Sequence, residues 1–196
     1  MTRPAVLDHP GRGSYASDVN KPPRKAARRP AAAAGLVFSL LGTAEAVEYV
    51  SALNVAARSL GVQLEVLNVS APEELNGAFA EISRRRAEGL VVLPDGMFWA
   101  VRADIVRLAG KARVPAIYWE RAYVEVGGLL SYAASLSDIA RRGGVLVDKI
   151  LNGAKPATLP VEQPTSFEFV INKKTAKALG LTIPSSLLLR TDKVIE

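Results

Sequence analysis

The 196-residue chain contains no cysteine and a single histidine, His9. Without cysteine, the chain has no disulfide scaffold, no thiolate nucleophile and no cysteine-ligated zinc site. Because the only histidine lies outside the region expected to fold, a histidine-dependent triad or metal site is also excluded there. No glycine-rich phosphate loop follows a predicted strand. We therefore expect neither a metal nor a cofactor.

No run of apolar residues is long enough to cross a membrane as a helix. The longest, residues 31–42, covers about a dozen positions, whereas a bilayer requires roughly 20. It follows a basic stretch and precedes Ala44-Glu45-Ala46, an order typical of a secretory signal peptide. Such a peptide would end near Ala46 and imply a periplasmic protein. Alternatively, residues 36–41 form the first strand of a sheet. A protein from which the N-terminal segment is not cleaved is expected to be cytoplasmic.

Positive charge is concentrated at one end of the chain. The net charge is +6, but residues 1–33 alone hold seven basic and two acidic side chains. These residues are rich in proline, glycine, serine and arginine and show no periodicity, so we expect a disordered basic head. The remaining 18 basic and 17 acidic residues nearly cancel. This balance disfavours a phosphate-binding surface, and hence nucleic acid as a partner.

Residues 34–196 alternate between strand and helix patterns. The predicted strands are residues 62–69, 89–93, 114–118, 129–132 and 167–171, and the predicted helices are residues 48–60, 70–87, 100–111, 136–151 and 175–179. Such alternation predicts an α/β fold, an open parallel sheet with flanking helices.

Local signals refine this assignment. Ser70 and Glu73 predict a capping box at the start of one helix, and Ser135 or Ser137 predicts the cap of another. Gly143-Gly144 lies inside a predicted helix, where glycine is unfavourable, and close packing against another element would explain it.

Two apolar runs, residues 90–93 and 114–118, each break into a loop that carries aromatic side chains and a carboxylate. In open α/β sheets, ligands bind outside the carboxyl ends of the strands, and aromatic walls with a few polar groups suit a small molecule. We expect the cleft to be lined by Asp95, Phe98, Tyr118, Trp119, Glu120 and Tyr132. The aromatic rings would offer flat apolar surface, and either carboxylate would bind an ammonium or hydroxyl group.

Each candidate also has a purely structural interpretation. Asp95 can cap the helix that follows it, Glu120 can pair with Arg121 in solvent, and Tyr132 can belong to the core. The aromatic residues together can simply fill the top of the sheet. Trp99 is expected to pack on its own helix.

Several segments resemble a known family. Residues 56–69 look like the start of the second lobe in bacterial ABC-transporter substrate-binding proteins of the tryptophan- and tyrosine-uptake type. Residues 147–156, 159–165, 167–172 and 174–184 resemble the same family more specifically, so that the resemblance covers roughly residues 50–196. It implies a type I periplasmic-binding fold, in which two lobes close over a small solute, and an ABC-transporter permease as partner.

The chain differs from the family in two ways, and each difference leads to a prediction. Family members are longer and have a complete first lobe, which the basic head does not resemble, so we expect one truncated lobe that binds its solute weakly. In that case residues 136–152 form a helix of the missing lobe, and Ile139, Val145, Leu146 and Ile150 are open to self-association. The family's Tyr-Gly-Pro is replaced by Tyr132-Ala133-Ala134, so the loop at Tyr132 should differ.

The sequence thus predicts a solute-binding component of an ABC importer, not an enzyme, that binds a small organic solute such as an amino acid. One alternative is a ligand-sensing regulatory domain of the same fold. The other is a hydrolase in which Asp95 and Glu120 form an acid/base pair.

Overall fold

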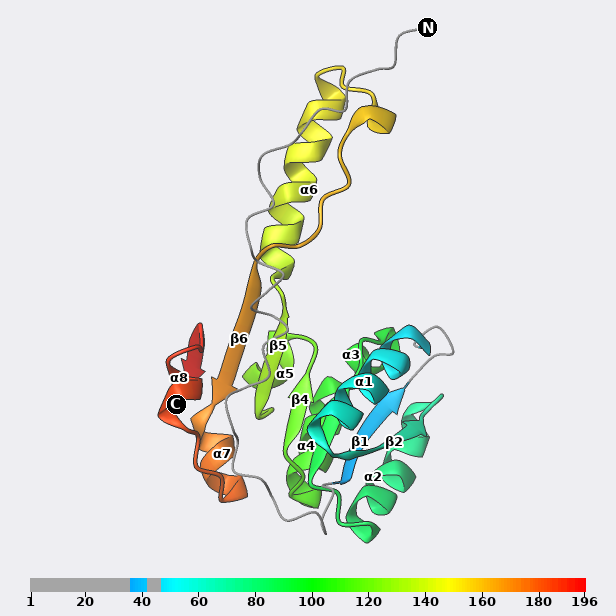
Figure 1. The fold of residues 1–196 in the computed structure, drawn as a ribbon, viewed down its shortest axis with the longest axis vertical. Helices are drawn as coiled ribbons and strands as arrows, with labels where there is room; N and C mark the ends of the chain where they lie inside the picture. Colours follow the sequence, from blue (N-terminus) through cyan, green and yellow to red (C-terminus); the bar gives the residue numbers. More distant parts are fainter. Residues whose placement is uncertain (1–35, 42–46) are drawn as a thin grey trace, which may run out of the picture. The chain divides into compact units, whose positions relative to one another are not determined.

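The computed structural model describes residues 36–41 and 47–196. The chain divides into two units, residues 1–33 and residues 34–196, and only the second contains described residues, so the head expected to be disordered lies outside them. The second unit is built on a seven-stranded sheet with the strand order β2-β1-β3-β4-β5-β6-β7 (Figure 1). The strands are β1 Leu36–Leu41, β2 Gln63–Asn68, β3 Gly89–Val92, β4 Ala116–Tyr118, β5 Leu130–Ala134, β6 Phe167–Asn172 and β7 Lys193–Ile195.

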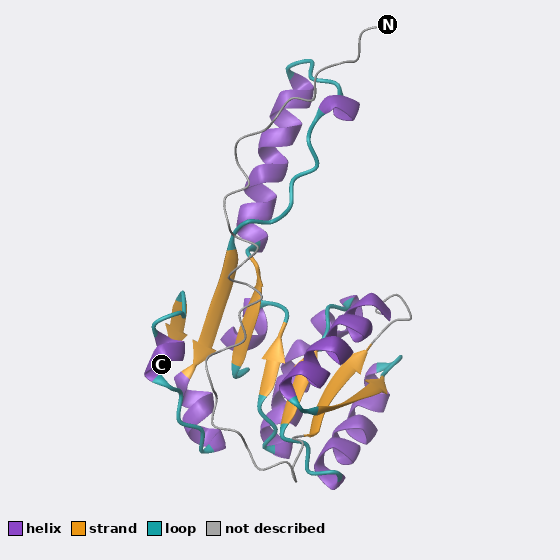
Figure 2. Cartoon of the chain, viewed as in Figure 1, coloured by secondary structure: helices purple, strands orange, loops and turns teal. Residues whose placement is uncertain are grey.

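Helices alternate with the strands, as the sequence predicts. They are α1 Val47–Leu60, α2 Leu75–Arg84, α3 Gly96–Ala100, α4 Arg102–Ala112, α5 Arg121–Glu125, α6 Leu136–Leu151, α7 Lys173–Leu179 and α8 Ser185–Leu188, with the 3₁₀ turns η2 Pro72–Glu74 and η3 Pro156–Thr158. Figure 2 shows that loop rather than helix or strand makes up most of the connection between α6 and β6. Among the described residues, none of the helices is both long and apolar enough to cross a membrane.

The core forms where α2 and α4 meet the central strands. On α2, the buried side chains are Leu75, Phe79 and Ile82, whose spacing places them on one face of a helix. They join buried side chains of α4, β3 and β4 in one apolar cluster that includes Ile105 and Leu90. This shared burial fixes the position of the neighbouring strands β3 and β4.

Residues 36–41 form β1, inside the sheet. Leu36–Leu41 pairs in parallel with β2 on one side and with β3 on the other, so that Phe38 lies opposite both Glu65 and Leu90. The strand interpretation of this segment is therefore confirmed. The predicted cleavage site near Ala46 lies outside the described residues.

The sheet is parallel from β2 to β5 but not throughout. β6 pairs antiparallel with β5, with Ala134 opposite Phe167. The predicted open parallel sheet is thus confirmed from β2 to β5. The antiparallel entry of β6 arises because the chain leaves the sheet at Ala134, passes through α6 and re-enters from the same end.

Two local predictions also need correction. The backbone N–H of Ser70 donates to Glu74 at 2.7 Å, and α2 has no side-chain cap, so the predicted capping box with Glu73 does not form. The helix predicted for residues 100–111 is divided at Val101 (φ −103°, ψ 22°), where α3 ends and α4 begins.

Helix α6 is amphipathic but has no buried residue. Ser135 caps it, as predicted, through a bond from the Asp138 N–H. Its apolar side chains include Ile139 (40% exposed) and Val145 (47% exposed), so its apolar face is open. Apart from the nearby backbone of α6 itself, no described atom lies within 4 Å of a Cβ built on either glycine of the pair Gly143-Gly144, so close packing against another element is absent from the described residues.

A second glycine pair, Gly127-Gly128, lies between α5 and β5 and controls the packing beside it. Gly127 has a φ of +105°, a backbone conformation that other residues rarely adopt. A Cβ on Gly128 would lie 2.6 Å from the Tyr123 carbonyl oxygen and 2.7 Å from Cε2 of Tyr118. The absence of a side chain at residue 128 is therefore a condition for the packing of both tyrosines.

We expect Gly128→Ala to destabilise the protein by about 1–3 kcal/mol, because the added methyl group meets a backbone oxygen that cannot easily move. Gly77→Ala is the matched control, since nothing lies within 4 Å of its Cβ, and replacement of glycine in α2 should stabilise by up to about 1 kcal/mol. Urea unfolding measures both changes. Equal stability of the two variants would contradict the close approach at Gly128.

Candidate functional site

In the loops that follow the neighbouring strands β3 and β4, a carboxylate caps a short helix. Asp95 accepts hydrogen bonds from the backbone N–H groups of Met97 (2.8 Å) and Phe98 (3.1 Å) at the start of α3. Glu120 accepts from the Ala122 N–H at the start of α5. Because β3 and β4 are parallel neighbours, both caps lie at the same edge of the sheet.

Capping uses only one of the two oxygen atoms of each carboxylate. Both bonds to Asp95 end on Oδ1, and the bond to Glu120 ends on Oε2, so within the described residues Oδ2 of Asp95 and Oε1 of Glu120 carry no hydrogen bond. The structural interpretation of Asp95 as a cap is confirmed. The structural alternative for Glu120, a pair with Arg121, does not form, because Arg121 bonds to Glu125 (2.7 Å) and Glu168 (3.2 Å).

Four aromatic rings pack together next to these caps. Tyr118 and Tyr123 stack with ring centroids 4.8 Å apart. Trp99 lies 5.6 Å from Trp119, and Tyr123 lies 6.2 Å from each of them. We call Trp99, Tyr118, Trp119 and Tyr123 the aromatic cluster. Trp99 thus contacts the loop after β4 and α5, which corrects the prediction that it packs on its own helix.

Arg102, the first residue of α4, covers one side of this cluster. Its guanidinium carbon lies 4.7 Å from the centroid of the Trp99 ring, within the range of a cation–π contact. Its Nη1 donates to the Trp99 carbonyl at 3.0 Å. These two contacts, across the break between α3 and α4, hold the guanidinium against the indole.

Three polar atoms of this group are buried. Among the described residues, Nε of Arg102, Nε1 of Trp119 and the hydroxyl of Tyr123 have no hydrogen bond of good geometry, although the Trp119 indole lies close enough to the Tyr123 hydroxyl to lower its pKa as a hydrogen-bond partner. A buried donor that lacks a partner costs about 1–3 kcal/mol, and this cost applies to Nε of Arg102 rather than to the Trp119–Tyr123 pair.

The environment of Tyr123 shows how close the charged groups are. Burial raises the pKa of its hydroxyl to about 12, while the Trp119 indole and Arg102 lower it and Asp95 and Glu120 raise it further. Burial also raises the pKa of Tyr118, with a smaller contribution from Tyr123. Both phenols are therefore neutral at physiological pH, and Tyr123 lies within electrostatic reach of both caps and of Arg102.

The six residues expected to line a cleft do not all lie in one place. Phe98 is fully buried and Tyr118 is 2% exposed, whereas Trp119 is half-buried beside Glu120. Tyr132 is 57% exposed and stacks on Phe167 instead, with ring centroids 5.7 Å apart, so it is not a core residue. Solute contact by these residues stays a prediction.

Reasoning from the sequence did not select Trp99, Arg102 or Tyr123 as site residues. The spacing of Trp99 and Arg102, three positions apart at the start of the predicted helix 100–111, is the signal that could have suggested a stacked pair. Tyr123 gives no comparable signal, because its position depends on the glycine turn that follows it.

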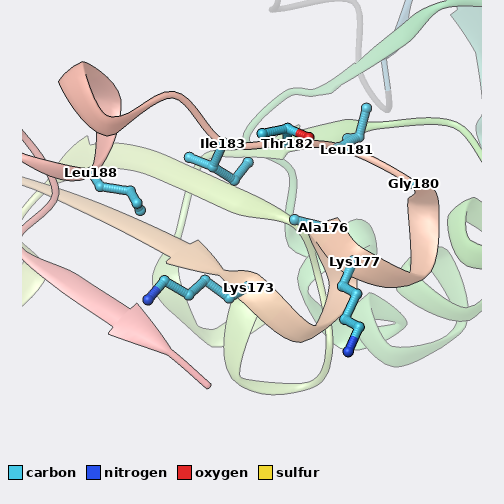
Figure 3. A pocket seen from close by; sticks show the side chains of 8 residues that line it. All are labelled: Lys173, Ala176, Lys177, Gly180, Leu181, Thr182, Ile183 and Leu188. Atoms are coloured by element: carbon cyan, nitrogen blue, oxygen red, sulfur yellow. The ribbon is translucent and has the colours of Figure 1, made fainter.

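A separate surface hollow of about 400 Å³ is lined by Lys173, Ala176, Lys177, Gly180, Leu181, Thr182, Ile183 and Leu188. In Figure 3 the side chain of Lys177 points away from Thr182 and Ile183. Lys173 bonds to Glu196 at 3.0 Å. The hollow has no set of polar groups that converge on a ligand, so we do not treat it as the solute site.

Tyr123 and Tyr118 should make the protein sensitive to alkali. Stability that is fully present below the ordinary tyrosine pKa of 10.0 is expected to fall between pH 10 and about 12, because the unfolded chain ionises there while buried Tyr123 stays protonated. The loss from Tyr123 is of the order of 2–3 kcal/mol. Unfolding by urea across this pH range measures it.

In Tyr123→Phe the loss of stability at alkaline pH should become smaller. The loss that remains comes from Tyr118. Tyr132→Phe is the control, since its ring is largely exposed and its replacement should leave the decline as in the wild type. An unchanged decline in Tyr123→Phe would contradict the burial of this hydroxyl.

Comparison with known proteins identifies the family. The sequence model described as "ABC transporter substrate binding protein" matches residues 32–195. A structure from Streptococcus pneumoniae, an ABC domain in complex with L-Trp, is 27% identical with a TM-score of 0.74, covering 82% of this chain and 56% of its own. A conserved domain protein from Vibrio cholerae is 25% identical with a TM-score of 0.73, covering 81% of this chain and 54% of its own.

A ligand-free, open substrate-binding protein from Clostridium difficile is 21% identical, covers 82% of this chain and 54% of its own, and with a TM-score of 0.62 supports the fold. No curated protein sequence matches the chain. The chain spans about half the length of the solved structures it matches. Since the family match extends over most of residues 34–196 and the fold is that of periplasmic-binding proteins, the chain belongs to the family of ABC-transporter substrate-binding proteins.

Proposed function

We propose that this chain is the solute-binding component of an ABC importer and holds a small organic solute, without changing it chemically, beside the aromatic cluster. The observation that carries the proposal is the joint position of four aromatic rings and two half-used carboxylates at the carboxyl ends of β3 and β4. Open α/β sheets bind their ligands at this edge, and aromatic walls with a few polar groups suit a small molecule.

The solute that fits best has a flat apolar part and polar ends. Trp119 offers a half-buried indole, and the free oxygens of Asp95 and Glu120 can accept hydrogen bonds from an ammonium or hydroxyl group. The similar structure from Streptococcus pneumoniae contains L-Trp, a solute with these features. An amino acid with an aromatic side chain is therefore the first compound to test.

The importer role implies a location and a partner. Members of this family work outside the cytoplasmic membrane and deliver solute to a permease, so we propose the periplasm and an ABC-transporter permease for this chain. Nothing in this role requires a reaction at the site. The two carboxylates act as helix caps, which accounts for their positions without an acid/base pair.

The chain contains exactly two tryptophans, Trp99 and Trp119, and both lie in the aromatic cluster. Tryptophan fluorescence, excited at a wavelength that tyrosine does not absorb, therefore reports on this site alone. Titration with L-phenylalanine or L-tyrosine should change the emission, with a dissociation constant near the millimolar range. Affinity should be low because one lobe supplies about half the contacts of a closed site, and each lost factor of ten corresponds to about 1.4 kcal/mol.

L-Alanine, which lacks the ring, is the control compound and should bind at least tenfold more weakly. Calorimetry with L-tryptophan extends the test to a solute whose own fluorescence interferes. An unchanged emission with every aromatic amino acid would refute solute binding at the cluster. Submicromolar affinity would instead contradict the idea that this lobe binds with half of the contacts.

We further propose that the open face of α6 is a contact surface, covered by another lobe or by a second copy of the chain when the protein acts. Each apolar side chain gains roughly 1.5–3 kcal/mol from full burial, so a face that includes Ile139, Val145 and Ile150 favours association.

Sedimentation velocity should show concentration-dependent oligomers, and Ile150→Lys should reduce them. Val161→Lys, 98% exposed in the loop before β6, is the matched control and should have no effect. A clean monomer at high concentration would overturn this part of the proposal.

A further inference from the structure

We propose that the lobe which covers α6 is a second copy of this chain, and that the two α6 helices pair antiparallel about a two-fold axis at Gly143. This inference rests on the contact surface proposed for α6 and names its occupant. The observation that carries it is that the apolar face of α6 is symmetric along the helix about this one glycine.

The symmetry can be followed in the printed sequence of α6. At three, four and seven positions from Gly143, an apolar residue stands on both sides of it. Residues at these separations share one face of a helix, so Gly143 lies at the centre of the apolar face. The symmetric pairs are Ala140 with Leu146, Ile139 with Val147, and Leu136 with Ile150.

Most of this face is open within one copy of the chain. The side chains that are at least 40% exposed are Leu136, Ile139, Val147 and Ile150. Leu146 is half-buried. The face therefore loses little by adopting a partner and gains the burial of its aliphatic side chains.

The segment that returns to β6 runs beside α6 but does not occupy the centre of this face (Figure 1). Arg142 holds it through Glu162 at 3.1 Å and Thr165 at 2.6 Å. Arg142 precedes Gly143 by one residue, which is about 100° around a helix with 3.6 residues per turn. The returning segment thus lies along one side of the apolar face and leaves Gly143 accessible.

Gly143 has no structural explanation within one copy. Glycine inside a helix is unfavourable relative to alanine, and Gly143 is not among the described glycines with a positive φ. Apart from nearby backbone of α6, no described atom lies within 4 Å of a Cβ placed on it. A missing side chain at the centre of an apolar face permits the close approach of a second backbone.

A two-fold axis accounts for both the glycine and the symmetry. It brings the two copies of Gly143 together and places each residue opposite the one at the same distance on the other side of Gly143. Ile139 then meets Val147 of the second copy, and in each half a large Leu146 meets a small Ala140. A partner of different sequence needs no such symmetry, so the pattern favours a second copy.

The length of α6 limits the strength of this contact. Its 16 residues span about 24 Å at 1.5 Å per residue. Two such faces bury on the order of 1,000 Å² in total, which is near the lower limit of specific interfaces. We therefore expect a dimer that dissociates in the micromolar range.

The first experiment cross-links the full chain, which contains no cysteine of its own. Leu136→Cys and Ile150→Cys are prepared as separate proteins, mixed, and oxidised with copper phenanthroline. The mixture should form disulfide-linked dimers at least tenfold faster than either protein alone. In the antiparallel pair residue 136 lies beside residue 150, whereas the two copies of residue 136 are about 21 Å apart along the helices.

A mixture of Leu136→Cys with Val161→Cys is the matched control. Residue 161 is exposed in the loop before β6 and is not part of the apolar face. This mixture should cross-link no faster than either protein alone. Faster cross-linking of Leu136→Cys with itself than with Ile150→Cys would show parallel pairing and overturn the inference.

The second experiment compares Gly143→Ala with Gly144→Ala by sedimentation equilibrium. Both substitutions add one methyl group where a single copy has no neighbour outside the nearby helix backbone, and both favour the helix to the same degree. Only residue 143 lies on the proposed axis. The dissociation constant of the dimer should rise at least fivefold in Gly143→Ala and change less than twofold in Gly144→Ala.

The remaining outcomes separate this inference from the proposed function. Equal effects of the two alanine variants, or oligomers that form without the cross-link between residues 136 and 150, would overturn the pairing about Gly143. A chain that stays monomeric at high concentration would overturn the inference together with the α6 contact surface. The fluorescence titration would still decide solute binding, because the aromatic cluster lies outside α6.

Discussion

The parallel pairing of β3 with β4 is the constraint on which the site depends. Its register places Leu90 opposite Ala116 and Val92 opposite Tyr118, so the two strands end together. Each strand is then followed by a carboxylate that turns the chain into a helix, Asp95 after β3 and Glu120 after β4. A shift in this register would separate the indoles of Trp99 and Trp119. The core side chains of α2 and α4 hold the register in place, because they pack on both strands at once.

The fold also loses stability at this end of the strands. Nε of Arg102 is buried there without a hydrogen bond, at a cost of about 1–3 kcal/mol, while the Trp119 indole and the Tyr123 hydroxyl lie close to each other without a hydrogen bond of good geometry. The protein tolerates this cost in a group whose other members are tightly packed, down to the glycine turn that admits both tyrosines.

Much of the fold could be predicted from local patterns, and the site only in part. The apolar runs of β3 and β4 and the spacing of Leu75, Phe79 and Ile82 carry enough information to place strands and a helix, and Asp95 carries a recognisable capping signal. The antiparallel entry of β6 could not be predicted, since it depends on how the chain returns from α6. Arg102 was not predicted as a site residue because an arginine at a helix start usually faces solvent. Only the position of Trp99 in the structure shows that this guanidinium lies against an aromatic ring.

Helix α6 has an apolar face that nothing covers within the described residues. Polar contacts of Arg142 with Glu162 and Thr165 hold the segment before β6 to this helix, and no residue of the helix is buried. Exposed ion pairs contribute at most about 1 kcal/mol each, so they do not replace the burial of an apolar face. Under the proposed function, a second lobe would cover α6 and close over the solute, so that one association would bury the apolar face and complete the proposed solute site.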